Sequence, residues 1–350
     1  MRGTPNSKPG RTYLRAGVVL LGALLLGLSA CQSRQDHTET TTTPPVGHYE
    51  GSVTVAGQPE LRAALDIRHP SPGHYEAELT VPAAGTLSFV ADTILFSNKQ
   101  LRLTRPARPA QSLTLTLEGD FWRGTLQLDS LRTEILLVKR GTPTPSAYRV
   151  EELPLDNGSM WLFTPADTGT PGPALALLPN VATAPAAALW ADALAREGVI
   201  VLVLPATDSA EAETPRLQNA LNVLRATAGA DTANVGAWAA GTRATTLAPT
   251  LAAATGPRLA FFIAQNAELG PASRAAFREL RRGKLPILGL YGGAAATQQA
   301  ADLRNALGGR RGAPVQAYRT AGPDLLLAGT AVAAFGPGLP GNVVKWLRSR

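Results

Sequence analysis

The segment Asn234-Val-Gly-Ala-Trp-Ala-Ala-Gly-Thr-Arg243 comes nearest, in this chain, to the pattern of an acyl-transfer site. An apolar run leads into a small-residue turn at Gly241, as a strand does when it delivers a nucleophile to a helix. Acyl transfer needs a nucleophile, an imidazole base and a carboxylate that orients the base. Gly241 has no side chain, and every histidine (His37, His48, His69 and His74) lies in the first 74 residues. The residues therefore predict a turn that has lost its nucleophile and its base.

The elements around this turn alternate between strands and helices from about residue 150 to residue 350. Continuous apolar runs at 174–178 and 199–204 are typical of strands that are buried on both faces. Further strands are expected at 235–240, 260–264, 286–291 and 315–318, and helices at 185–197, 213–229, 242–254, 271–282, 296–307 and 342–348. Strict alternation of this kind predicts an α/β fold, with a mostly parallel sheet and helices on both faces.

The preceding residues, 46–141, alternate with a period of two. Leu61, Ala63, Leu65 and Ile67 share one face of a strand, while Asp66 and Arg68 share the other. Turn residues at 56–59, 70–73, 97–99 and 118–120 separate such runs. Short strands at this spacing predict a smaller all-β sandwich or barrel domain, with the polar face of each strand in solvent.

The first 45 residues predict targeting and tethering. A basic leader without acids precedes an apolar run at 16–28, which is shorter than the roughly 18 residues of a membrane span. Leu28-Ser-Ala-Cys31 resembles the lipobox of bacterial lipoproteins. That resemblance implies a lipoprotein signal peptide over 1–30 and an acylated Cys31 whose acyl chains enter the membrane. An ordinary signal peptide with a chance cysteine is the alternative. Residues 31–45 read as a flexible spacer.

Composition and charge give no indication of nucleic-acid binding, a disulfide, a metal site or a cofactor. The chain has a formal net charge of +7, and loss of the four basic leader residues lowers it to about +3, which does not indicate nucleic-acid binding. With Cys31 as the single cysteine, no disulfide is expected. No acidic cluster follows Cys31, so we expect a periplasm-facing protein of the bacterial cell envelope. His69 and His74 flank a turn, but two histidines without further ligands do not predict a metal site, and no cofactor motif is found.

The order of these segments resembles secreted bacterial α/β-hydrolases of the esterase and dienelactone-hydrolase type, related to serine aminopeptidases, which carry a β-domain before the catalytic one. The resemblance spans nearly all of the chain after the leader. Its segments are GHYEG at 47–51, WADALAREGVIV at 190–201, KLPILGLYG at 284–292 and VVKWL at 343–347.

The resemblance also assigns the catalytic positions. The elbow G-x-S-x-G falls on Ala239-Ala-Gly241-Thr242-Arg243, so glycine stands where the nucleophile is expected. The oxyanion loop falls on Pro179-Asn180-Val181. The acid position, after Tyr291, reaches Ala295, and the histidine position falls beside Asp324. No catalytic residue is therefore assigned, and the expected function is binding of a small molecule or protein, or scaffolding.

Three alternatives remain at this point. Thr242 and Asp324 could form an improvised catalytic pair, in which case the chain would be an active esterase or peptidase of the same family. The chain could instead be a purely structural envelope module. Arg274, Arg278 and Arg281 share one helix face, which would contact an anion or a membrane headgroup, or simply be solvated.

Overall fold

The computed structural model describes residues 43–155, 158–209, 213–309 and 314–350. The predicted signal peptide, Cys31 and most of the spacer lie outside the described residues. The described residues belong to one compact unit. At the end of the predicted spacer, Pro44 is buried and the Pro45 carbonyl accepts a hydrogen bond from the Tyr49 hydroxyl at 2.9 Å. No helix within the described ranges has the length and apolar character needed to cross a membrane.

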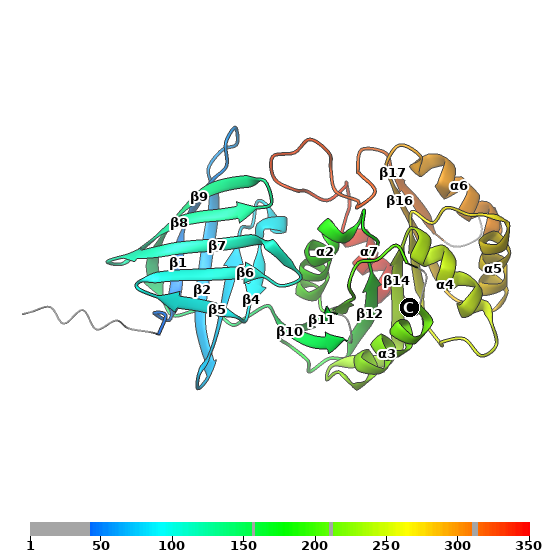
Figure 1. The fold of residues 1–350 in the computed structure, drawn as a ribbon, viewed down its shortest axis with the longest axis horizontal. Helices are drawn as coiled ribbons and strands as arrows, with labels where there is room; N and C mark the ends of the chain where they lie inside the picture. Colours follow the sequence, from blue (N-terminus) through cyan, green and yellow to red (C-terminus); the bar gives the residue numbers. More distant parts are fainter. Residues whose placement is uncertain (1–42, 156–157, 210–212, 310–313) are drawn as a thin grey trace, which may run out of the picture. The chain divides into compact units, whose positions relative to one another are not determined.

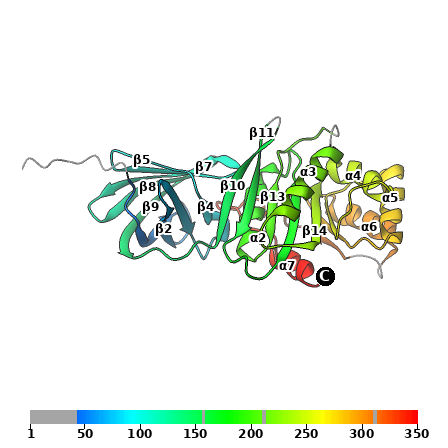
Figure 2. The ribbon, with the colours of Figure 1, turned by 90° about the horizontal axis from the view of Figure 1, so that it is seen from below.

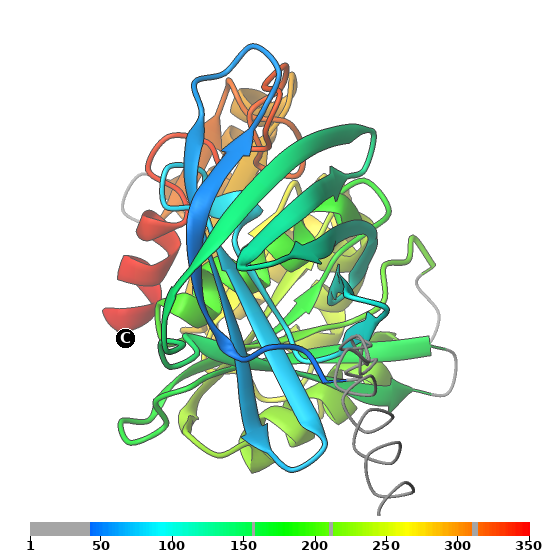
Figure 3. The same cartoon turned by 90° about the vertical axis from the view of Figure 1, so that its left-hand side faces the viewer.

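The first nine strands form one antiparallel sheet, called sheet A here, in the order β4-β3-β2-β1-β9-β8-β7-β6-β5. Sheet A curls until it nearly closes around a core of apolar side chains (Figure 3). The prediction of an all-β segment is thus confirmed in coarse form, as one nearly closed antiparallel sheet. The strands are β1 (Gly47–Thr54), β2 (Leu61–Ser71), β3 (His74–Thr80), β4 (Phe89–Ala91), β5 (Ile94–Ser97), β6 (Gln100–Arg105), β7 (Arg108–Glu118), β8 (Phe121–Leu128) and β9 (Leu131–Gly141).

The outward faces of β2 and β3 differ from the prediction. Asp66, Arg68, Glu76 and Glu78 point away from the core of sheet A, yet all four are buried. They are covered because the chain that leaves β9 runs across these strands, with Thr144 bonding to Asp66. The expected solvated face is therefore wrong for β2 and β3. A short 3₁₀ helix, η1 (Gly85–Leu87), also lies between strands where no helix was expected.

The second sheet, called sheet B, has the order β10-β11-β13-β12-β14-β15-β16-β17. Strands β10 and β11 form an antiparallel hairpin, and β12 to β17 pair in parallel. The predicted mostly parallel sheet is confirmed in this coarse form (Figure 1). The strands are β10 (Tyr148–Leu155), β11 (Gly158–Pro165), β12 (Gly172–Leu178), β13 (Ile200–Val203), β14 (Ala230–Ala240), β15 (Phe262–Gln265), β16 (Ile287–Gly292) and β17 (Val315–Tyr318).

Helices cover both faces of sheet B (Figure 2). One face packs against α2 (Ala184–Arg196) and α7 (Gly341–Arg348), and the other against α3 (Glu213–Ala226), α4 (Thr242–Ala252), α5 (Pro271–Arg282) and α6 (Ala296–Ala306). Within β12, Ala174, Ala176 and Leu178 enter one core, while Leu175 and Leu177 enter the other. The continuous apolar sequence of this strand follows from that double coverage.

Candidate functional site

The strand-to-helix turn at Gly241 has the backbone of a strained elbow. Strand β14 ends at Ala240, α4 begins at Thr242, and Gly241 between them has φ 55° and ψ −126°. Residues with a side chain rarely adopt such a positive φ. A Cβ placed on Gly241 would lie 2.5 Å from the Asn180 amide nitrogen, which is closer than van der Waals contact allows. A side chain at this position would therefore require the Asn180 amide to move.

Asn180 is held in that space by its own loop. Its Oδ1 accepts hydrogen bonds from the Thr183 backbone N–H at 3.1 Å and the Thr183 hydroxyl at 2.8 Å. Because Oδ1 takes both donors, Nδ2 is the end that faces Gly241. At the next residue the Val181 N–H donates to Asp208 at 3.3 Å, although the Val181 side chain is 61% exposed. The loop predicted as an oxyanion loop therefore fills the space at the elbow. The Val181 backbone N–H is already engaged in a hydrogen bond with Asp208.

The elbow also carries a buried ion pair, called the Arg243 clamp here. Arg243 Nε donates to one Glu213 oxygen at 2.9 Å and Nη2 to the other at 3.0 Å. Its Nη1 reaches the carbonyls of Pro179 at 2.8 Å and Pro205 at 2.9 Å. Both partners are buried, Arg243 at 1% exposure and Glu213 at 2%. Burial lowers the pKa of Arg243, and the hydrogen bond with Glu213 opposes that shift. One guanidinium thus ties the elbow to α3 and to two loops.

The predicted acid and base positions hold no catalytic pair. Ala295 is the residue that precedes α6. Asp324 Oδ1 accepts the Leu326 backbone N–H at 3.1 Å, which closes a local turn. Thr242 is exposed, and within the described ranges its hydroxyl makes no hydrogen bond. The structure therefore does not bring Thr242 and Asp324 into hydrogen-bond contact. His48, His69 and His74 all lie on β1 to β3 of sheet A.

Two amides at the end of β15 support the elbow and were missed from the sequence. Gln265 Oε1 accepts the Trp238 indole N–H at 2.8 Å, and its Nε2 donates to the Pro323 carbonyl at 2.7 Å. The Gln265 backbone carbonyl accepts the Gly241 N–H at 2.8 Å. Asn266 donates to the same Pro323 carbonyl and accepts the Gly292 N–H at 2.8 Å. Adjacent amides directly after an apolar strand were the only available signal.

The weaker sequence candidates have ordinary surroundings. The His69 ring is exposed and stacks on Tyr75, with 4.3 Å between ring centroids. Among the described residues, no three His, Cys, Asp or Glu side chains gather as metal ligands would. On α5, Arg278 and Arg281 are exposed, while Arg274 is half-buried and donates to the Leu269 carbonyl at 3.5 Å. The arginine face is thus largely solvated.

A buried charge network joins sheet A to α2 and β10. Arg105 on β6 is 1% exposed, and its Nη2 lies 3.0 Å from Asp192 of α2. Asp192 also accepts the Tyr148 hydroxyl, and that hydroxyl in turn accepts the Val90 N–H at 3.0 Å. Burial raises the pKa of Asp192, and Arg105 opposes that shift. Pairing of this kind is required for buried charges to be tolerated.

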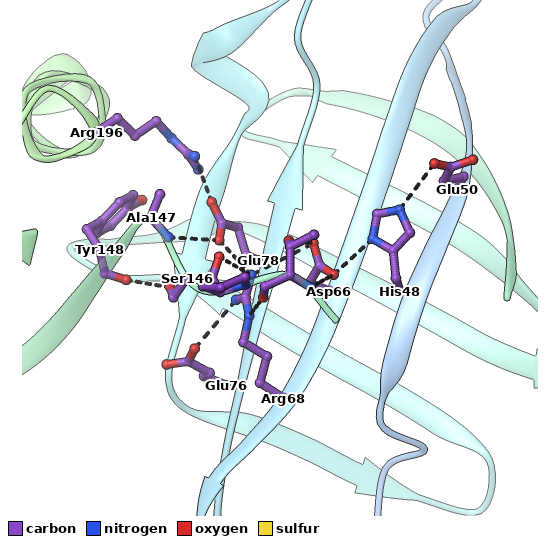
Figure 4. A network of polar contacts seen from close by, with 12 residues as sticks. His48, Glu50, Asp66, Arg68, Glu76, Glu78, Ser146, Ala147, Tyr148 and Arg196 are labelled. Atoms are coloured by element: carbon purple, nitrogen blue, oxygen red, sulfur yellow. Dashed lines mark hydrogen bonds and ion pairs between the residues drawn. The ribbon is translucent and has the colours of Figure 1, made fainter. Parts of the chain in front are cut away.

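A second branch of the network links β1, β2 and β3 to α2 (Figure 4), and its ends at Glu50 and Arg196 are partly open to solvent. Arg196 of α2 pairs with Glu78 at 2.6 Å, and Glu78 pairs with Arg68 at 2.9 Å. His48 hydrogen-bonds to Asp66 at 2.9 Å and to Glu50 at 3.2 Å. Burial lowers the pKa of His48, but these carboxylates outweigh burial and leave that pKa above its ordinary value. The buried charges on β2 and β3 thus contact both α2 and the chain that leads into sheet B.

Comparison with solved structures finds bacterial hydrolases at low similarity. Esterase 2 from Thermogutta terrifontis, phosphorylated by paraoxon, shares 17% identity at a TM-score of 0.38, over 59% of this chain and 93% of that chain. A protein assigned as a dienelactone hydrolase from Klebsiella pneumoniae shares 16% identity at a TM-score of 0.42, over 59% of this chain and all of the other. No protein-family model and no curated protein matches the chain.

Proposed function

We propose that sheet B and its helices form an α/β-hydrolase-like module that does not catalyse hydrolysis and instead serves in binding or scaffolding. The observation that carries the proposal is the contact at the elbow, where a Gly241 Cβ would lie 2.5 Å from Asn180. The turn keeps a positive φ, but its interior is occupied by the Asn180 amide. Loss of one triad member alone lowers turnover by about 10⁴-fold or more.

The Arg243 clamp supports the same proposal from the other side of the turn. In G-x-S-x-G the last position is glycine, which leaves room beneath the nucleophile. Here a large cation takes that position and is neutralised by Glu213 at 2.9 Å. Such a pair costs desolvation of both charges and adds no reactive group. Its geometry suits a role in fixing α3, α4 and two loops in place.

A fluorophosphonate probe tests the proposal directly. Such probes label an activated serine or threonine, so we expect the purified protein to remain unlabelled. Labelling that is lost in Thr242→Ala would favour the alternative, an active esterase or peptidase, and would overturn the proposal. An active bacterial esterase labelled in parallel controls for the probe, and Ser273→Ala controls for adventitious reaction at a buried helix serine.

A second variant pair tests whether a base lies near the elbow once a serine is supplied there. Gly241→Ser alone should remain unlabelled, because the new side chain meets Asn180. Gly241→Ser with Asn180→Gly removes that contact but supplies no histidine, so it too should remain unlabelled. Labelling of the double variant would indicate a base near the elbow and would count against the proposal.

We further propose that the protein is anchored in the bacterial cell envelope through acylated Cys31, facing the periplasm. The support is the sequence Leu28-Ser-Ala-Cys31 after a short apolar run. Metabolic labelling with an alkyne fatty acid should modify the protein, and Cys31→Ala should abolish the label and release the protein from the membrane fraction. Equal labelling of Cys31→Ala would refute lipidation at this residue.

A further inference from the structure

A cleft of about 520 Å³ lies between the β5–β7 region of sheet A and the β10–β11 hairpin of sheet B. Its lining is mostly apolar, with a few charged side chains among prolines and large hydrophobic groups. Small-molecule sites have volumes of roughly 300–1,000 Å³ and this kind of lining. The cleft is separate from the elbow, because neither Gly241 nor Asn180 lines it.

Each wall of the cleft presents one large apolar side chain beside one charge. On sheet A, Leu95 and Arg102 are cross-strand partners, and Leu95 is 65% exposed. On sheet B, Trp161 and Glu152 are cross-strand partners. Directly opposed residues of an antiparallel pair lie on the same face. The indole and the Glu152 carboxylate therefore face the cleft together.

Asp92 supplies a second carboxylate to the cleft. It is half-buried, and its only side-chain hydrogen bond within the described ranges comes from the Thr93 hydroxyl at 3.4 Å. It makes no ion pair with any described residue. Burial raises the pKa of Asp92, and the charge of His74 opposes that shift without forming an ion pair, so no cationic partner contacts this carboxylate among the described residues. A bound cation would supply that partner.

The charges that line the cleft indicate the sign of the charge that a ligand would carry. Arg105 also lines the cleft, but its charge is already neutralised by Asp192 at 3.0 Å. Among the described residues that line the cleft, the two carboxylates Asp92 and Glu152 then stand against the single unpaired cation Arg102. A monocation would balance this set, whereas an anion would meet a net negative lining. An indole is also the side chain that best attracts organic cations.

We propose that this cleft binds a small organic monocation with an apolar body, such as a primary amine on an aromatic or aliphatic group. The ammonium would bind Asp92 and Glu152, and the apolar body would pack on Trp161 and Leu95. The proposal is independent of the elbow, since it stands whether or not sheet B supports hydrolysis.

Isothermal titration with phenethylamine tests the site, with phenethyl alcohol as the neutral analogue and hydrocinnamate as the anionic one. We expect phenethylamine to bind and both analogues to bind more weakly. Asp92→Asn should lower the affinity for phenethylamine by about tenfold, as expected for loss of a hydrogen bond to a charged group. Trp161→Leu should weaken it as well. Glu268→Gln, an exposed carboxylate outside the cleft, is the matched control and should leave the affinity unchanged.

Thermal unfolding of each variant checks that the fold is kept, and Glu152→Gln offers an exposed second carboxylate if Asp92→Asn unfolds. Absence of phenethylamine binding would overturn the proposal. So would equal binding of hydrocinnamate, or an affinity that a folded Asp92→Asn protein retains in full.

Discussion

Replacing Arg243 with methionine would test the clamp beneath the elbow. The substitution keeps most of the side-chain volume but removes the charge and four hydrogen bonds of 2.8–3.0 Å. Within the part of the chain that the structure describes, Glu213 would then be buried with only Arg216, at 3.4 Å, as a cationic partner. Breaking one side of a buried pair costs about 3–5 kcal/mol. We therefore expect the free energy of unfolding to fall by about that amount.

Urea unfolding followed by circular dichroism would measure this loss, and a double-mutant cycle would assign it. Glu213→Leu alone should also be strongly destabilising, because it leaves a buried guanidinium. The double variant should recover at least about 2 kcal/mol of the summed cost, since two apolar side chains replace the pair. Arg216→Met, which touches the same carboxylate from a partly exposed position, should cost less than about 1 kcal/mol. A cost below about 1 kcal/mol for Arg243→Met would refute the reasoning.

Three further predictions concern the turn and the charge network. Gly241→Ala should lower the free energy of unfolding by about 1–3 kcal/mol, because Gly241 has a positive φ and its Cβ would meet Asn180 at 2.5 Å. Adding Asn180→Gly should recover part of that loss in the same urea assay. An unchanged stability of Gly241→Ala would contradict the crowding at this turn. Since His48 has a raised pKa when folded, its stabilisation is present below its unfolded pKa of about 6.5 and is lost as the pH rises through the folded value. His48→Asn should thus cost more stability at about pH 5.5 than at about pH 8.5, and a pH-independent cost would be the contrary result. Tyr148→Phe should lower the free energy of unfolding, measured by calorimetry, by about 1–3 kcal/mol, because Asp192 and the buried Val90 N–H both lose a hydrogen-bond partner. An unchanged melting temperature would contradict the network.

Much of the fold could be predicted because it depends on periodicity. Alternation in Leu61 to Ile67 reflects one face that enters an apolar core, and the unbroken apolar runs of β12 and β13 reflect two such faces. Strand β14 begins at Ala230, earlier than the expected 235, because its polar start pairs with Gly172 of β12. Hydrophobicity alone does not register that pairing.

The candidate site was harder to predict because its decisive contacts join distant residues. The sequence places Gly241 in a turn, but it does not reveal that Asn180 fills the space above it. It places Arg243 on a helix start, where a solvated arginine is the default, and Glu213 lies 30 residues away. For the same reason Asp66 and Arg68 read as solvent-facing, although a later segment buries them.

The pairing of Arg105 with Asp192 has a practical consequence for anyone dividing this chain into pieces. Expressed alone, the N-terminal half would expose the Arg105 guanidinium, which is buried in the whole protein. The C-terminal half would expose the Asp192 carboxylate and the Tyr148 hydroxyl without their N-terminal partners. Such fragments would expose surfaces that are buried in the whole protein. Their aggregation would be caused by the division of the chain and would not be a property of the native protein. A protein that begins after Cys31 and keeps all later residues in one chain is the sound choice for biochemistry.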